Sequence, residues 1–198
     1  MQDQTKLSYL APPTTMGFIH TICMILDGLL IEHDKNVVSL YGSKEKEEEQ
    51  KIVYEAFFIF ATMWGYGGSV GGGQDDNEVI GKFNGIFKSL VKIKFPEGGV
   101  CFDYYWNVDE LKWSTWASKI PNYEHTDEPI FNKIFVPTIH TTRLRYLLDM
   151  HLKRKKPILF VGGAGTGKTQ VIKDYLATTK PDQVAYKVIN FSSFTDAA

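Results

Sequence analysis

The residues with the clearest chemical potential form a glycine-rich stretch in the last quarter of the sequence. Residues 162–169, Gly-Gly-Ala-Gly-Thr-Gly-Lys-Thr, match the phosphate-binding pattern GxxxxGK[ST] at every fixed position. Glycines let backbone N–H groups turn toward a phosphate, because no Cβ stands in the way. The Lys168 ammonium can reach the β- and γ-phosphates of a nucleotide, and the Thr169 hydroxyl can bind Mg²⁺. The pattern predicts a nucleotide-binding loop.

Such a loop needs a buried strand before it and a helix after it. Residues 157–161, Pro-Ile-Leu-Phe-Val, have the composition of a short buried strand, and residues 170–177 have the apolar spacing of a helix. A helix that begins near Lys168 offers unpaired N–H groups and the positive end of its dipole to the same phosphate. The order strand, loop, helix is therefore the context that the motif requires.

Another amphipathic helix is predicted just upstream, over residues 141–152, with leucines along one face. It leads into the basic run 153–156. Basic residues at a helix C-terminus suit the negative end of the dipole, so we interpret this run as a solvated helix end.

The residues before about position 95 predict three helices. Apolar residues recur at helical spacing over 18–30, 52–63 and 79–90, with candidate caps at Thr14 or Thr15, at Ser43 and at residues 75–77. Between the second and third helices, residues 65–73 contain six glycines. No Lys-Ser or Lys-Thr pair follows them, so this stretch predicts a flexible loop that ends the second helix.

Residues 95–135 are rich in aromatic and turn-forming residues. Tryptophan and tyrosine rings could stack on single-stranded nucleic acid, but acidic residues are interleaved with them. This composition favours buried packing of an irregular segment.

The composition of the 198 residues excludes several classes of protein. The apolar share is 43%, the charged share 23% and the net charge −1, so no basic field attracts nucleic acid or an anionic membrane. Cys23 and Cys101 have no CxxC spacing and are expected to be buried thiols in a reducing compartment. The apolar stretch 16–31 is broken by His20 and Asp27, and falls short of the roughly 20 residues of a membrane span. No membrane span and no secretory signal are predicted.

ATP hydrolysis needs an acidic motif besides the phosphate-binding loop, namely four apolar residues followed by Asp-Glu. Beyond Thr169 the sequence offers one predicted strand, residues 184–191, and then Ser192 to Asp196 without such a motif. Cys23 to Asp27 precedes the loop and is followed by Gly28 in place of Glu. No catalytic residue is therefore assigned, and the chain is expected to end within a nucleotide-binding domain.

Four segments in order, 58–68, 95–105, 134–143 and the phosphate-binding loop, resemble dynein heavy chains. The stretch is similar to the join between the second and third AAA+ modules, and closer to axonemal chains, of outer-arm type, than to the cytoplasmic motor. The resemblance implies an α/β fold with an incomplete sheet. A helical small subdomain, residues 1–95, would be followed by an aromatic connecting segment, 96–130, and by the start of a P-loop module, 131–198.

The resemblance also implies a ligand and a site. The ligand would be ATP or ADP with Mg²⁺, and Thr169 would bind the metal. The implied nucleotide-binding residues are Val136, Pro137, Thr138, Gly163, Ala164, Gly165, Thr166, Gly167, Lys168, Thr169 and Gln170. The first three would lie against the adenine. Water-activating residues would come from downstream sequence, and an arginine finger from a neighbouring module.

As a dynein fragment, the chain would carry a regulatory site that tunes an ATP-driven microtubule motor in ciliary movement. Its partners would be the rest of the heavy-chain ring and, through the whole protein, microtubules and the dynein intermediate and light chains, with no nucleic acid and no membrane. Its place would be the cytoplasm and the cytoskeleton, in the axoneme of a cilium or flagellum. Two alternatives remain open at this point: a separate P-loop nucleotide-binding regulator, and a helical interaction module with a vestigial loop.

Overall fold

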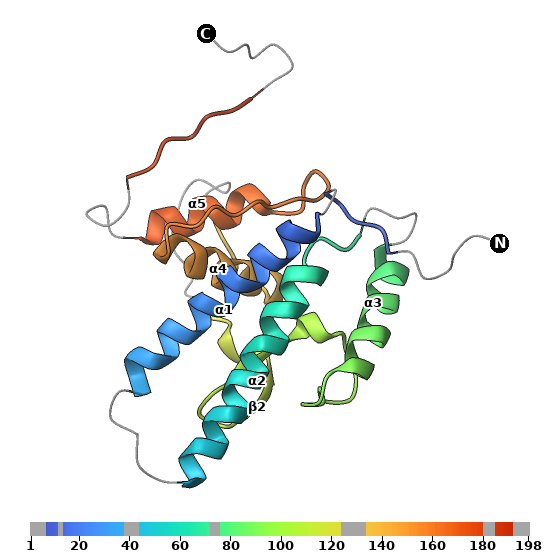
Figure 1. Ribbon diagram of the computed structural model, residues 1–198. Helices are drawn as coiled ribbons and strands as arrows, with labels where there is room; N and C mark the ends of the chain where they lie inside the picture. The colour runs from blue at the N-terminus through green and yellow to red at the C-terminus, as the bar shows by residue number, and fades with distance from the viewer. Residues whose placement is uncertain are drawn as a thin grey trace, which may run out of the picture.

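Two long antiparallel helices, α1 (Thr15–Val37) and α2 (Lys44–Gly67), form the centre of the computed structural model (Figure 1). The structure describes residues 7–11, 14–37, 44–71, 76–123, 134–179 and 185–191. The Thr14 hydroxyl accepts a hydrogen bond from the Gly17 N–H at 3.0 Å, which confirms Thr14 as a cap of α1. The predicted cap Ser43 lies outside the described residues. The first two predicted helices are confirmed.

The glycines at the end of α2 belong to the helix, and the prediction of a loop from residue 65 onward was wrong there. A Cβ on Gly65 would lie 2.4 Å from Cγ1 of Ile22, and one on Gly67 would lie 2.5 Å from the rings of Phe83 and Phe102. These contacts need the absence of a side chain. Close packing against α1 and against two aromatic rings therefore outweighs the helix cost of glycine, about 1 kcal/mol per residue.

The third predicted helix is also confirmed, as α3 (Asp76–Leu90), which lies on the other side of α2 from α1 (Figure 1). It buries Phe83 and Phe87, whose rings stack at 5.4 Å between centroids. Phe83 also stacks on Phe102 at 5.5 Å. This aromatic column joins α3 to the segment that follows it.

The aromatic segment folds against the helices around a short hairpin. It contains η1 (Cys101–Asp103), β1 (Tyr104–Asn107), β2 (Lys112–Thr115) and η2 (Trp116–Lys119). The strands pair antiparallel with Trp106 opposite Trp113. Trp116 is fully buried and its Nε1–H donates to the Phe102 carbonyl at 3.0 Å. The expected burial of the aromatic rings is confirmed in the hairpin and its flanking turns, but Tyr123 is 43% exposed, and the hairpin itself was not predicted.

Helix α1 differs from its prediction in length and in one side chain. Residues 15–34 are long and apolar enough to cross a membrane by length and composition alone, although the sequence stretch was judged too short. In this fold α1 contributes Ile25 and Leu29 to the core, and the Met150 side chain covers Gly28. Cys23 is exposed, contrary to expectation, while Cys101 is buried as expected. Cys23 lies on the face of α1 that points away from the core, because the helical repeat turns some of the apolar residues of this helix outward.

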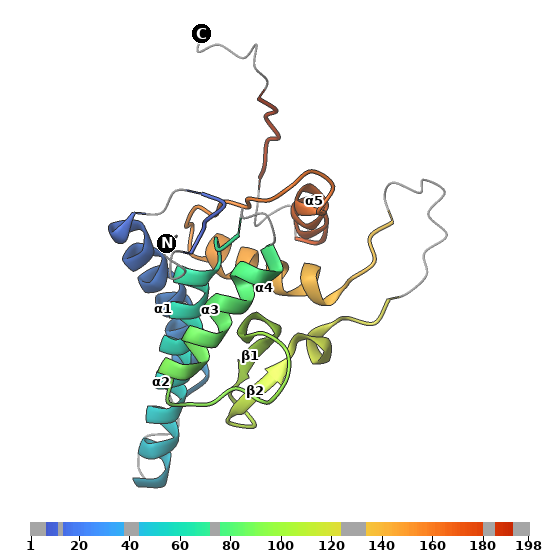
Figure 2. The same ribbon diagram turned by 90° about the vertical axis from the view of Figure 1, so that its right-hand side faces the viewer.

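Helix α4 (Ile139–Lys153) confirms the amphipathic helix predicted upstream of the loop. Its side chain Tyr146 packs against the rings of Phe60 and Trp116, with centroids 6.2 and 5.3 Å apart. Burial, and secondarily the charge of Glu32, raises the pKa of Tyr146 well above its usual range. In Figure 2, α4 runs from the side of the hairpin toward α1 and carries α5 above it. The C-terminal part of the chain is therefore packed onto the helical part through α4.

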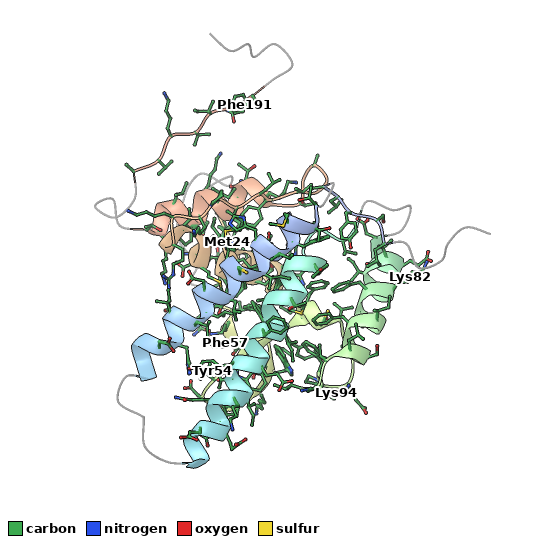
Figure 3. All side chains as sticks on the ribbon, in the orientation of Figure 1. Met24, Tyr54, Phe57, Lys82, Lys94 and Phe191 are labelled. Atoms are coloured by element: carbon green, nitrogen blue, oxygen red, sulfur yellow. The ribbon has the colours of Figure 1, made fainter. Side chains whose placement is uncertain are left out.

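The two strands predicted around the phosphate-binding loop do not form. Residues 157–161 have no regular structure, and Leu159 is 78% exposed. Residues 185–191 run away from the body of the molecule, with Phe191 81% exposed (Figures 1 and 3). A strand is stable only when its N–H and C=O groups pair with a neighbour, and no neighbouring strand lies beside either segment in the described part of the chain.

Candidate nucleotide-binding site

The glycine-rich loop adopts backbone angles that need glycine. Gly165 and Gly167 have φ of 77° and 80°, in the left-handed region, and Gly162 has φ of 154°. Gly167 is the residue before helix α5 (Lys168–Thr178), which confirms the predicted helix after the loop. A Cβ added at Gly163, Gly165 or Gly167 would meet no atom of the described residues within 4 Å, chain neighbours aside. The loop therefore has open space on its side-chain faces.

The Lys168 side chain folds back over this loop. Its ammonium donates to the carbonyl oxygens of Gly162 and Gly163 at 2.9 and 2.5 Å, and to Thr166 Oγ1 at 2.9 Å. The Thr166 hydroxyl in turn donates to the Gly163 carbonyl at 3.0 Å. An ammonium group has three donors, so all three are used inside the loop. Lys168 must release part of this set in order to contact a phosphate.

The residues present fit a nucleotide phosphate and its magnesium ion. The first turn of α5 has N–H groups without a partner inside the helix, and these lie at the positive end of its dipole. Lys168 adds a full positive charge at the same end. Thr169 and Gln170 are exposed there, so the Thr169 hydroxyl is accessible to a metal ion. Bound Mg²⁺ would neutralise phosphate charge at this end of the helix.

Side chains from α4 hold α5 in place. The Arg145 guanidinium forms a close ion pair with Asp174 and donates to the Thr178 hydroxyl at 2.5 Å. The Tyr175 hydroxyl donates to Asp149 at 2.8 Å. Burial, together with this hydrogen bond, raises the pKa of Tyr175, which keeps the hydroxyl protonated as a donor. The sequence analysis missed this network. The available signal was that Arg145 and Asp149 stand four residues apart, and therefore on the same face of the predicted helix, which could have been expected to contact α5.

The segment expected to contact adenine lies away from the loop. Thr138 caps α4, since its Oγ1 accepts from the Thr141 N–H at 3.2 Å, and Val136 is 53% exposed. Pro137 lines a cavity of about 620 Å³ together with Asp174 and Thr178, in the second half of α5. Of the described loop residues 162–169, none lines that cavity. The structure therefore assembles residues 163–170 and leaves 136–138 at the opposite end of α5.

Two family models match the sequence, and together they cover almost all of it. The model of the dynein heavy chain AAA lid domain matches residues 3–118, which include α1, α2, α3 and the hairpin. The model of the P-loop containing dynein motor region matches residues 123–198, which include α4, the loop and α5.

Individual relatives agree with these models. The dynein alpha chain of the flagellar outer arm of Chlamydomonas reinhardtii is 32% identical over 197 residues, 99% of this chain and 4% of the relative. Dynein axonemal heavy chain 11 of Sus scrofa is 32% identical over 182 residues, 92% of this chain and 4% of the relative. The ciliary dynein beta chain of Heliocidaris crassispina is 33% identical over 183 residues, with the same shares. The chain thus spans about 4% of the length of these relatives. It belongs to the dynein heavy chain family, as a helical AAA+ lid followed by the start of a P-loop domain.

Proposed function

We propose that this segment supplies the phosphate-binding half of a regulatory nucleotide site in an ATP-driven microtubule motor. The observation that carries the proposal is the loop geometry, with Lys168 at the head of α5, within residues that match the P-loop containing dynein motor region. A site of this kind would sense ATP or ADP and change the populations of ring conformations.

In this proposal each residue has one role. Residues 163–168 and Gln170 surround the phosphates, Lys168 provides the positive charge, and Thr169 binds Mg²⁺. Val136, Pro137 and Thr138 contact the adenine once the segment and the loop come together in the whole protein. We also propose the division into a helical subdomain, 1–95, a connecting segment, 96–130, and the start of the next module, 131–198.

The names of the relatives support the wider setting. They are flagellar outer-arm, axonemal and ciliary dynein chains. We infer that the parent of this segment works in the cytoskeleton of a cilium or flagellum, in the axoneme, and that its other ring modules are its immediate partners. Microtubules and dynein intermediate and light chains would be partners of the whole protein.

The test is a Lys168→Ala substitution in the full-length heavy chain, with Lys173→Ala as the control. Lys173 is an exposed lysine on the same helix that takes no part in the loop. Loss of a charged hydrogen-bond donor should weaken nucleotide binding at this site by about 10- to 100-fold. The measurement is the number of fluorescent ADP molecules bound per heavy chain, alongside the velocity of microtubule gliding.

The two readouts separate the possibilities. Lys168→Ala should remove one bound nucleotide per chain and change the gliding velocity, whereas Lys173→Ala should change neither. Unchanged nucleotide binding in Lys168→Ala would mean that the loop is vestigial. Loss of the nucleotide without any change in gliding would refute the regulatory role.

A further inference from the structure

The phosphate-binding groups stand at the first turn of α5, and the contacts that hold this helix lie further along it. Its buried side chains are Val171 and Tyr175, one turn apart. Of the helices and strands in the described ranges, α4 packs most extensively against α5 (Figures 1 and 2). The direction in which the first turn of α5 points therefore depends on α4.

Apolar contact alone would hold α5 loosely. Burial of apolar surface has no preferred direction, so two buried side chains on one line allow the helix to roll about that line. Hydrogen bonds, in contrast, weaken steeply when their angle departs from the preferred one. The polar contacts between α4 and α5 are therefore the ones that fix the rotation of α5.

Arg145 makes the most extensive of these polar contacts. Its guanidinium pairs with the Asp174 carboxylate and donates to the Thr178 hydroxyl at 2.5 Å. It also lies 5.4 Å from the centroid of the Tyr175 ring. Asp174 and Thr178 are four residues apart and lie on one face of α5, and the guanidinium is a rigid fork that contacts both. One side chain of α4 thus holds a full turn of α5.

The other polar contact between the two helices is less exclusive. The Tyr175 hydroxyl donates to Asp149 at 2.8 Å, but Asp149 also pairs with Lys153 of its own helix at 2.7 Å. In the described part of the chain, the Asp174 carboxylate forms its ion pair with Arg145 only. The Asp174 side chain is 21% exposed, so water screens this pair only in part. Arg145 is therefore the main polar constraint on α5.

A small change at this contact has a larger effect at the loop. Asp174 stands six residues after Lys168, which is about 9 Å along a helix. A reorientation of α5 by about 10° around Asp174 would move its first turn by about 1.6 Å. Hydrogen bonds from N–H groups span donor–acceptor distances of only about 2.7–3.2 Å. A displacement of this size would therefore take the N–H groups of the first turn out of hydrogen-bonding range of a phosphate.

We propose that Arg145 is a positioning residue of the nucleotide site. Through Asp174 and Thr178 it holds α5 in one orientation. In that orientation the N–H groups of the first turn, the Lys168 ammonium and the Thr169 hydroxyl meet the phosphates and Mg²⁺ together. The inference rests on the function proposed above, and it adds to that function a residue outside the phosphate-binding motif that acts through α5.

The first test measures the affinity of fluorescent Mg-ADP in the full-length heavy chain, at the site that Lys168→Ala removes. Arg145→Met keeps the aliphatic stem without the guanidinium, and Asp174→Ala removes its partner. Each should weaken binding by at least about fivefold. The double variant should lose no more than about twofold beyond the weaker single variant, because both changes break one contact.

Lys173→Met is the matched control, since it removes an exposed positive charge from the same helix and should leave the affinity unchanged. An equal loss in Lys173→Met would show a general effect of charge and overturn the positioning role. Losses that multiply in the double variant would also overturn it, because Arg145 and Asp174 would then act separately.

The second test separates positioning from general stability. Amide hydrogen exchange in the same heavy chains should become faster over residues 168–178 in Arg145→Met and stay the same in α1 and α2. Faster exchange in all three helices would show a general loss of structure and overturn the proposal. Unchanged affinity in Arg145→Met beside a loss in Lys168→Ala would refute the positioning role and leave the proposed function standing. Unchanged affinity in Lys168→Ala would refute both.

Discussion

At the scale of single residues, Lys168 shows how a phosphate-binding loop can hold its shape with its own side chain. Its ammonium satisfies three oxygen acceptors of the loop, including two carbonyls next to the left-handed glycine turn. Backbone carbonyls that converge on one point repel each other unless a cation lies between them. The lysine therefore stabilises the loop as well as providing charge for a ligand.

The two cysteines should differ sharply in reactivity. Cys101 is fully buried, and burial raises the pKa of its thiol to about 12, so almost no thiolate exists at pH 8. Cys23 is exposed on α1. Iodoacetamide at pH 8 should therefore label one thiol in the native chain and two after denaturation, as counted by mass spectrometry. Equal labelling rates of both thiols in the native chain would contradict the packing around Cys101.

His33 should make the stability of the helical part depend on pH. Burial lowers the pKa of His33 below its ordinary value of 6.5, and the nearby Asp34 charge opposes this only in part. Below pH 6.5 the unfolded chain therefore binds a proton that the folded chain resists, and stability falls as the pH falls. A thermal melt should show a smaller loss between pH 7.5 and 5.5 in His33→Phe than in the unmodified chain. The same loss in both would mean that another group controls it.

At the scale of elements, the helices α1 and α2 approach each other closely at Gly65, next to the stacked rings of Phe18 and Tyr66. The sequence signal for Gly65 and Gly67 was ambiguous, because glycine marks both a loop and a close helix contact. Helical periodicity, in contrast, was sufficient to locate α1 to α5, since each helix buries a distinct apolar stripe. The hairpin escaped prediction because its strands have only four residues each, and because β1 is buried along most of its length, so that it shows no alternation of buried and exposed residues.

Adding one methyl group should have opposite effects at two helical glycines. In Gly65→Ala the new Cβ would lie 2.4 Å from Ile22 Cγ1, and it would also lie closer to the Ile22 backbone than ordinary van der Waals contact allows. We therefore expect the free energy of unfolding to fall by about 1–3 kcal/mol. In Gly81→Ala, on the exposed face of α3, the Cβ meets no described atom within 4 Å, so we expect a gain of about 0.5–1 kcal/mol. Urea unfolding measures both. Equal stability of the two variants would refute the close contact.

At the scale of the whole molecule, the helical lid and the phosphate-binding loop differ in how far they are assembled. The lid has a continuous buried core, with Phe60, Met63 and Trp116 at most 2% exposed. The loop was predictable from its motif, because the residue types are fixed by the backbone angles. The strands around it formed no ladder, since pairing depends on residues that are distant in sequence and no local pattern can supply them.

Nucleotide should consequently leave the melting temperature of the 198-residue chain unchanged. Residues 157–161 lead into the loop without strand partners, and residues 136–138 lie away from it. A ligand raises the melting temperature only if the folded state binds it more tightly than the unfolded state. We expect one cooperative melt from the lid, at the same temperature with and without Mg-ATP. An increase of several degrees would show that the chain assembles the pocket alone.

The two-sided packing of α4 has a mechanical consequence. On one side Tyr146 and Met150 are embedded in the lid, and on the other Arg145 and Asp149 hold α5. A fifteen-residue helix that is packed on both sides acts as a stiff lever that pivots in the lid core. A tilt of α5 therefore has two outcomes: the lid turns with it, or the Arg145 and Tyr175 contacts break. The backbone of residues 162–167 is expected to yield before α4 does, because it has four glycines and is held by the Lys168 and Thr166 side chains rather than by a packed core.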